Sequence, residues 1–222
     1  MKTFLLTFTA MLGTLFFIGC RAEQKQELLS QQSCQSCSIS PSSVQAEGVM
    51  TIFKDDGSKF FTSQTHLICL CDNSILIKTT TADGEAIFKL DANGNFNYSG
   101  ISLPANSPLN IFDKQIAGLI LEMLIAAKSD HTIINSDPVN IYGQWYHKTS
   151  TQKNGYAFYE NLDTNRLDLI ISKDYFAKGY DYKNSSALTA VFPATIEISS
   201  VGKNNSPGVK VLKIEYTDIM AH

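Results

Sequence analysis

Four cysteines in the chain occur as two close pairs, and thiols at this spacing can form disulfides or hold a metal ion. The pairs are Cys34-x-x-Cys37 and Cys69-x-Cys71. In an oxidising compartment an even number of cysteines favours disulfides. Residues 69 and 71 lie two apart in an expected strand, so their side chains share a face and cannot easily bond to each other. We therefore expect bridges between the two pairs, with free thiols or a four-thiolate zinc site as alternatives.

Other residue types that catalyse reactions are scattered along the chain. The four histidines (His66, His131, His147 and His222) stand far apart, and none has the spacing of a metal-binding motif. Nucleophile-elbow, phosphate-loop and dinucleotide fingerprints do not occur in the sequence. Glu122 is unusual because it lies in an apolar segment, but no acid, base or nucleophile accompanies it. We therefore predict a protein that is not an enzyme and that uses no cofactor or metal.

The first twenty residues have the order of an export signal. Lys2 is followed by an apolar run over residues 4–18 and then by Gly19 and Cys20. This run is shorter than the roughly 20 apolar residues of a spanning helix. Residues 17–20, Phe-Ile-Gly-Cys, resemble the lipobox of bacterial lipoproteins, in which a small residue precedes a lipidated cysteine. The resemblance implies that residues 1–19 are a signal peptide and that acyl chains on Cys20 hold the protein at a membrane. An ordinary secretory signal or an uncleaved anchor is the alternative.

The rest of the chain has the composition of one globular domain on a tether. Residues 20–222 carry 17 basic and 21 acidic side chains without charge blocks, so nucleic acid is not an expected partner. Residues 20–43 are rich in Gln and Ser, which is typical of a flexible tether. Residues 44–222 are expected to form the folded domain, because 44% of the chain is apolar and this is enough to build a core.

From residue 44 onwards the sequence predicts an antiparallel meander. Its apolar segments are separated by short turns of Asp, Asn and Gly, which only antiparallel neighbours can use. The last expected strand alternates apolar and polar residues, so one face of the sheet should be buried and the other wet. The expected strands are residues 44–54, 59–71, 75–81, 85–90, 139–149, 156–161, 166–172, 188–199 and 209–218.

One helix is expected in the middle of the chain, over residues 112–128. Apolar side chains follow helical spacing on one side, and Ala117, Leu121 and Leu124 fill much of the other side. A helix that is apolar nearly all round is buried nearly all round. We therefore predict a mainly β fold: a single curved antiparallel sheet, or an open, unclosed β-barrel, with one long buried helix across its concave face.

The order of these elements resembles that of the lipoprotein-carrier superfamily of LolA and LolB. A tether, a meander, one apolar helix and a second meander follow one another up to about residue 218. Residues 192–198, Phe-Pro-Ala-Thr-Ile-Glu-Ile, followed by residues 211–216, look like the final hairpin of that family, and residues 159–167 are similar to the strand-turn-strand before it. The resemblance implies a curved sheet whose hollow, closed by helices, binds acyl chains or another apolar ligand, with the central helix as a lid.

A hollow that holds an acyl chain needs an apolar lining, because an unpaired polar atom there costs free energy. The same residues would also serve to fill an ordinary closed core. The candidate lining residues are Ile68, Leu70, Ile75, Ile77, Phe88, Ile116, Leu119, Ile120, Met123, Leu124, Tyr142, Trp145, Ile170, Ile196 and Ile214.

These observations predict a membrane-anchored lipoprotein of the bacterial cell envelope that binds a lipid or a lipoprotein acyl chain. Its expected location is the periplasmic face of the outer membrane. The alternative is a structural or interaction lipoprotein with a closed β core that docks onto another envelope protein. A third interpretation is a hydrolase with an unrecognised site.

Overall fold

The computed structural model of the chain describes residues 43–70, 72–126, 137–153, 155–184, 191–203 and 206–221. All of these segments belong to one compact unit. The predicted signal peptide, Cys20 and nearly all of the predicted tether lie outside the described residues, as do Cys34, Cys37 and Cys71. These predictions therefore stay predictions.

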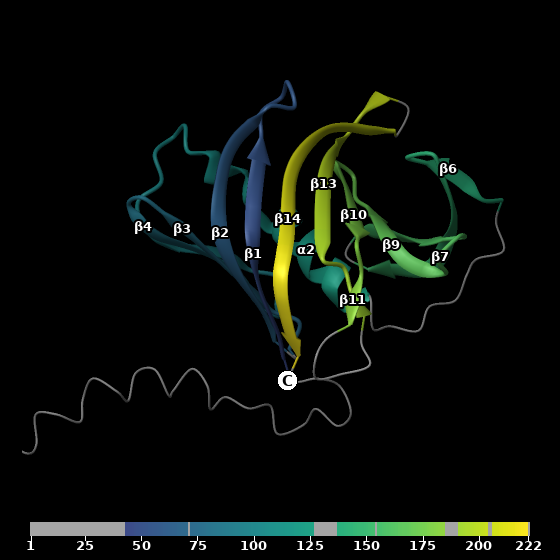
Figure 1. The fold of residues 1–222 in the computed structure, drawn as a ribbon, viewed down its shortest axis with the longest axis horizontal. Helices are drawn as coiled ribbons and strands as arrows, with labels where there is room; N and C mark the ends of the chain where they lie inside the picture. The colour runs from purple at the N-terminus through teal and green to yellow at the C-terminus, as the bar shows by residue number, and fades with distance from the viewer. Residues whose placement is uncertain are drawn as a thin grey trace, which may run out of the picture. The chain divides into compact units, whose positions relative to one another are not determined.

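Twelve strands of the described segments form one antiparallel sheet (Figure 1). In chain order they are β1 (Ser43–Phe53), β2 (Lys59–Leu70), β3 (Ile75–Thr81), β4 (Gly84–Leu90), β5 (Phe96–Gly100), β6 (Val139–Ile141), β7 (Gln144–Lys153), β8 (Tyr156–Asn161), β9 (Arg166–Ile171), β10 (Tyr175–Tyr180), β13 (Thr195–Val201) and β14 (Pro207–Ala221). A separate ribbon pairs β11 (Lys183–Asn184) with β12 (Val191–Phe192). The order across the large sheet is β5-β4-β3-β2-β1-β14-β13-β10-β9-β8-β7-β6, so this sheet is open, with β5 and β6 at its edges.

The first and last strands lie side by side in the middle of the sheet. β1 pairs with β2 on one side and with β14 on the other, where Val44 lies opposite Ala221. The register between β1 and β14 shifts at Gly48. A Cβ added to Gly48 would lie 2.3 Å from the carbonyl oxygen of Glu215, so only glycine allows this close approach of the two backbones. The centre of the sheet is complete only when the C-terminal strand is in place.

In the described residues, the α-helix α2 (Lys114–Ala126) follows a 3-10 turn, η1 (Pro108–Ile111), and lies against one face of the sheet (Figure 1). Asp113 caps its start, because the Asp113 Oδ1 atom accepts a hydrogen bond of 2.8 Å from the backbone N–H of Ile116. None of the helices in the described segments has the length and apolar character needed to cross a bilayer.

The sheet curves around α2. This helix contacts both β4 and β9, which are seven strand intervals apart in the sheet. A flat sheet would hold these two strands about 34 Å apart, at about 4.8 Å per interval. A helix with its side chains is only about 10–12 Å across. The predicted fold class, a mainly β protein with an open, curved antiparallel sheet and a helix on its concave face, is confirmed.

The main core lies between the concave face and α2. Residues 116–124 of the helix are all buried, which confirms that the helix is enclosed on every side. Apart from Gly118 and Glu122, they pack with strand residues such as Met50, Phe88 and Ile196 in one cluster. The ring of Phe112 closes the start of the helix by stacking on Phe88, with ring centroids 4.5 Å apart.

At the β6 edge the sheet curls to the opposite side. Gln144 of β7 accepts a hydrogen bond from the ammonium group of Lys178 in β10. In a flat sheet these two strands would lie three intervals, about 14 Å, apart. Ala177 belongs to the main core, and the next side chain along the strand, Lys178, points to the opposite face. The contact between Lys178 and Gln144 therefore lies on the outer face of the sheet. The β6–β7 hairpin therefore folds over the outer face of β9 and β10.

A second, smaller core fills this outer curl. Tyr146, Leu169 and Phe176 are fully buried there. Asp168 and Lys178 are each only 5% exposed beside them. We call these five residues the outer-face cluster. Two charged side chains are thus enclosed in a core that the sequence did not predict.

Several strand predictions are wrong in detail. Residues 139–149 form a hairpin instead of one strand, turned at Tyr142 and Gly143 with φ values of 55° and 76°. Two positive φ values are typical of a tight hairpin turn, but tyrosine rarely adopts them, so the residues at this position do not predict a turn. The expected strand over residues 188–199 is interrupted between β12 and β13, at Pro193 and Ala194. β5 and β10 were not predicted.

Candidate functional site

Eleven of the fifteen predicted lining residues lie in the core between the sheet and α2. Each is at most 2% exposed. Their side chains pack against one another and against the helix, and their role as a ligand lining stays a prediction. These residues are Ile75, Ile77, Phe88, Ile116, Leu119, Ile120, Met123, Leu124, Ile170, Ile196 and Ile214.

The other four predicted lining residues do not belong to that core. Ile68 and Leu70 alternate with the buried Leu67 and Cys69 of β2, so they point to the opposite face, where Leu70 is 45% exposed. Trp145 is 51% exposed to solvent. The prediction is wrong for these three because the buried parity of the strands was misassigned.

Tyr142, the fourth residue, was also predicted wrongly. It lies at the turn of the β6–β7 hairpin, where its ring meets Phe176 edge-on, with centroids 6.4 Å apart. It therefore covers the outer-face cluster rather than the hollow under α2.

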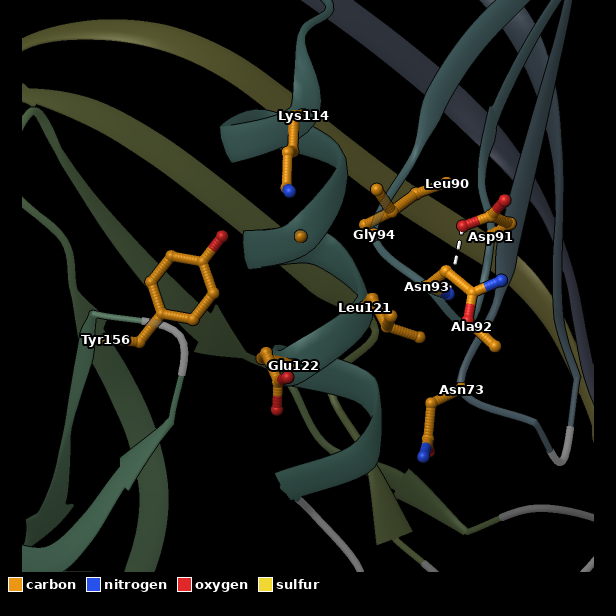
Figure 2. Close-up of a pocket in the computed structure, with 11 residues that line it drawn as sticks. Asn73, Leu90, Asp91, Ala92, Asn93, Gly94, Lys114, Leu121, Glu122 and Tyr156 are labelled. Carbon is orange, nitrogen blue, oxygen red and sulfur yellow. Dashed lines mark hydrogen bonds between the residues drawn. The ribbon is translucent and has the colours of Figure 1, made fainter.

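A pocket of about 470 Å³ opens beside α2 (Figure 2). The helix contributes Lys114, Gly118, Leu121 and Glu122, whose spacing of four, seven and eight residues places them on one side. The facing wall consists of Asn73, Leu90 at the end of β4 and residues 91–94 of the β4–β5 turn. Tyr156 lines another side of the pocket. In Figure 2, Leu121 points toward the β4–β5 turn and Glu122 lies on the side nearer Tyr156.

Gly118 allows Tyr156 to reach the helix. A Cβ added to Gly118 would lie 2.4 Å from the Tyr156 hydroxyl oxygen. That hydroxyl group donates a long hydrogen bond of 3.5 Å to the carbonyl oxygen of Gln115. Burial, with the nearby carboxylates of Glu122 and Asp113, raises the pKa of Tyr156 to about 12. The phenol therefore keeps its proton at neutral pH and supplies a hydrogen-bond donor at the rim of the pocket.

The β4–β5 turn is a fixed wall. Asp91 Oδ1 accepts hydrogen bonds from the backbone N–H groups of Asn93 and Asn95, at 2.9 and 2.8 Å. Its Oδ2 atom accepts another, of 3.0 Å, from the Asn95 amide. The hydrogen bonds from Asn95 are the main cause of a lowered Asp91 pKa. The Lys114 ammonium group lies against this turn, because a Cβ added to Gly94 would be 3.1 Å from Lys114 Nζ.

A second pocket of about 380 Å³ shares Lys114 and Tyr156 with the first. Its other lining residues include Gln115, Ser172 and Lys173. The Gln115 amide donates a 2.9 Å hydrogen bond to Ser172 Oγ, which ties the helix to the end of β9. The two pockets therefore meet around Lys114 and Tyr156.

Neither a protein-family model nor a curated protein matches the sequence. Among solved structures, the chain is similar to a LolA superfamily protein from Nitrosomonas europaea, with a TM-score of 0.50 and 11% identity over 82% of this chain and 87% of that one. The body has a LolA-like fold. At this identity the likeness concerns the fold alone.

Two further solved structures are similar at lower TM-scores. One is a DUF1329 family protein from Desulfovibrio piger, with a TM-score of 0.39 and 11% identity over 83% of this chain and 87% of that one. The other is a domain named as an outer membrane lipoprotein-sorting protein from Vibrio parahaemolyticus, with a TM-score of 0.40 and 11% identity over 89% of this chain and 90% of that one.

Most of the pocket residues of this LolA-like body were not predicted. The sequence indicates Glu122 as an unusual polar residue, but no local signal connects it with Tyr156 or Lys114. The described residues contain no group of three His, Cys, Asp or Glu side chains placed to hold a metal ion. Cys69 is buried in the main core, and the cysteines predicted to bond with it lie outside the described residues.

Proposed function

We propose that this chain is a lipid-anchored protein of the bacterial envelope that binds a hydrophobic ligand, a lipid or a lipoprotein acyl chain, between α2 and the concave face of the sheet. The observation that carries the proposal is a helix whose residues 116–124 are buried across the concave face of a LolA-like sheet, with a pocket that opens along the side of Lys114, Gly118 and Glu122. The proposal comprises binding alone, without a catalytic step.

The size and position of the first pocket support ligand binding. Its volume of about 470 Å³ falls within the range of roughly 300–1,000 Å³ that is usual for small-molecule sites. Leu90 and Leu121 line it and also belong to the main core, so an apolar tail in the pocket would be continuous with that core. Each methylene group buried there would contribute about 0.8 kcal/mol.

Lipid that co-purifies with the protein tests the proposal. The full chain carrying Cys20→Ser would be purified from envelopes, and native mass spectrometry would count bound lipid without interference from the anchor. We expect about one lipid or acyl chain per protein. The same chain with Leu121→Trp, which fills the pocket, should retain less lipid. Leu162→Trp, an equal change at a 38% exposed leucine away from the pocket, should retain as much as the parent. Lipid-free parent protein would contradict the proposal.

The anchor is tested separately by labelling cells with a palmitate analogue. We expect label on the full chain and none on Cys20→Ser. Cys34→Ser is the matched control and should be labelled like the parent. Equal labelling of Cys20→Ser would contradict lipidation at this position.

A second function, docking onto another envelope protein, is favoured by exposed apolar residues near the β6 edge. Val139 and Trp145 are 42% and 51% exposed, and the backbone N–H of Leu162 donates a 3.0 Å hydrogen bond to the carbonyl oxygen of Trp145. If this function holds instead, Trp145→Glu abolishes cross-linking to one defined envelope protein, and the parent protein carries no lipid.

A further inference from the structure

We infer that the ligand of the site beside α2 is an amphiphile with an anionic head group, carboxylate or phosphate, which binds at Lys114 where the two pockets meet. This inference rests on the proposed function and assigns the head-group class that the function leaves open. The tail would run through the first pocket, past Gly118 and between Leu121 and Leu90.

Two lysines supply the positive charge. Lys114 lines both pockets and Lys173 lines the second. Neither takes part in the ion pairs formed between described residues, which join Lys210 to Glu197 and Lys213 to Glu215. Figure 2 shows the Lys114 side chain extending along the pocket, and its ammonium group lies close to Gly94 of the β4–β5 turn. An anion placed there would be attracted by a cation that forms no ion pair with a described carboxylate.

The Tyr156 hydroxyl group adds a hydrogen-bond donor at the same place. Its 3.5 Å bond to the Gln115 carbonyl oxygen is long, so the exchange for a bond to an anionic oxygen costs little. A hydrogen bond to an ionised acceptor is about twice as strong as one between neutral groups. The head group would therefore have an ammonium group and a phenol as partners.

The carboxylates near Lys114 do not occupy this place. Asp113 uses Oδ1 to cap the helix, and Asp91 uses both oxygens within its own turn. Glu122 lies eight residues beyond Lys114, which is about 12 Å along the helix axis, so its carboxylate acts on the Tyr156 hydroxyl group and not on the Lys114 ammonium group. In Figure 2, Glu122 lies on the Tyr156 side of the helix and Leu121 faces the β4–β5 turn, so a tail beside Leu121 and Leu90 avoids the Glu122 carboxylate.

Ligands with one tail and different heads test the inference. Decanoate, decyl phosphate and decanol would be titrated by calorimetry at pH 8, each below its aggregation concentration, into the full Cys20→Ser chain. We expect the two anions to bind at least about tenfold more tightly than decanol, which corresponds to about 1.4 kcal/mol. Lys114→Gln should remove most of this preference, and Lys173→Gln part of it, without changing decanol binding. Added salt should weaken the binding of the anions only.

The matched control is Lys59→Gln, a neutralised lysine at the exposed start of β2, which should leave all three affinities unchanged. Equal affinities for decanol and decanoate would overturn the inference while leaving lipid binding intact. A preference for the anions that neither Lys114→Gln nor Lys173→Gln reduces would do the same. Failure of all three ligands to bind would instead count against the proposed function. Inorganic phosphate is the fourth ligand: if it binds as tightly as decyl phosphate, the site takes a bare anion and the amphiphile assignment is wrong.

Discussion

Lys178 is enclosed by groups that replace its water shell. Its ammonium group lies 5.1, 5.8 and 5.0 Å from the ring centroids of Tyr142, Tyr146 and Tyr180, and it donates a hydrogen bond to Gln144. The negative faces of aromatic rings attract a cation, and this attraction is stronger when water is excluded. Burial lowers the pKa of Lys178, and the nearby acidic groups oppose this effect. Since Tyr142 and Gln144 belong to the β6–β7 hairpin, Lys178 fastens this hairpin to the outer face.

Lys178→Met should loosen the hairpin. The variant keeps the apolar stem but loses the hydrogen bond and the ring contacts and leaves Asp168 without its nearby cation, which should cost about 1.5–3 kcal/mol of folding free energy. Urea unfolding measures this loss, and hydrogen exchange should quicken at the amides of β6 and β7. Lys183→Met, at an exposed lysine, is the control. Unchanged exchange in the hairpin would show that Lys178 does not hold it.

Asp168 makes stability depend on pH in an unusual direction. Burial raises its pKa from 3.8 to about 6, although the hydrogen bond from Asn161 and the positive charges of Lys178 and Arg166 lower the pKa. The folded state therefore holds the proton more tightly than the unfolded state, so stability falls as pH rises from about 4 to about 6. At neutral pH this raised pKa costs at most about 3 kcal/mol.

Asp168→Asn should remove this cost. Asparagine can still accept the 3.1 Å hydrogen bond from Asn161. The melting temperature of the variant relative to the parent should be higher at pH 7.5 than at pH 4.5, although the loss of a charge near Lys178 reduces the gain. Melting curves at the two pH values measure the difference. A relative melting temperature that does not change with pH would show that Asp168 titrates normally.

At the scale of elements, the contact between α2 and β8 depends on an absent side chain. Gly118→Ala would place a methyl group 2.4 Å from the Tyr156 hydroxyl oxygen, and overpacking of this kind costs about 1–3 kcal/mol. In the Tyr156→Phe background the nearest ring atom would be the carbon 3.3 Å away. Alanine should then stabilise the helix by up to about 1 kcal/mol. Urea unfolding of the parent, the two single variants and the double variant measures whether the effect of alanine on the free energy of unfolding changes sign. Equal effects in both backgrounds would contradict the contact.

The elements that the sequence predicts well are those with their own local signals. The strands before residue 91 end in turns of Asp, Asn and Gly, and the helix is continuous in its apolar spacing. The β6–β7 hairpin was missed because its turn uses Tyr142, and β10 because it places Lys178 and Gly179 inside a strand. The pocket was missed for another reason: Lys114 and Tyr156 are far apart in sequence and meet only through the curvature of the sheet. No local pattern carries that information.

At the scale of the whole described body, the sheet is built from the inside by its two ends. β14 pairs with β1 and with β13 and supplies buried residues from Leu212 to Ile219. A chain ending at Ser206 would lose this strand and expose two pairing edges in the middle of the sheet. We expect such a chain to show no cooperative unfolding transition by circular dichroism. A chain ending at Ala221 is the control and should unfold like the parent; a cooperative transition in the shorter chain would contradict this role of β14.

The central position of β1 also determines how well the folded body resists unfolding by a mechanical force. The chain enters the sheet at Ser43, and β1 is held by β2 and β14 along both of its sides. A force applied through residue 43 acts along the strand, so it loads many of these hydrogen bonds at once in shear instead of opening them one after another. A protein tethered through the segment before β1 would therefore resist unfolding by a pulling force better than the same sheet tethered through an edge strand such as β5.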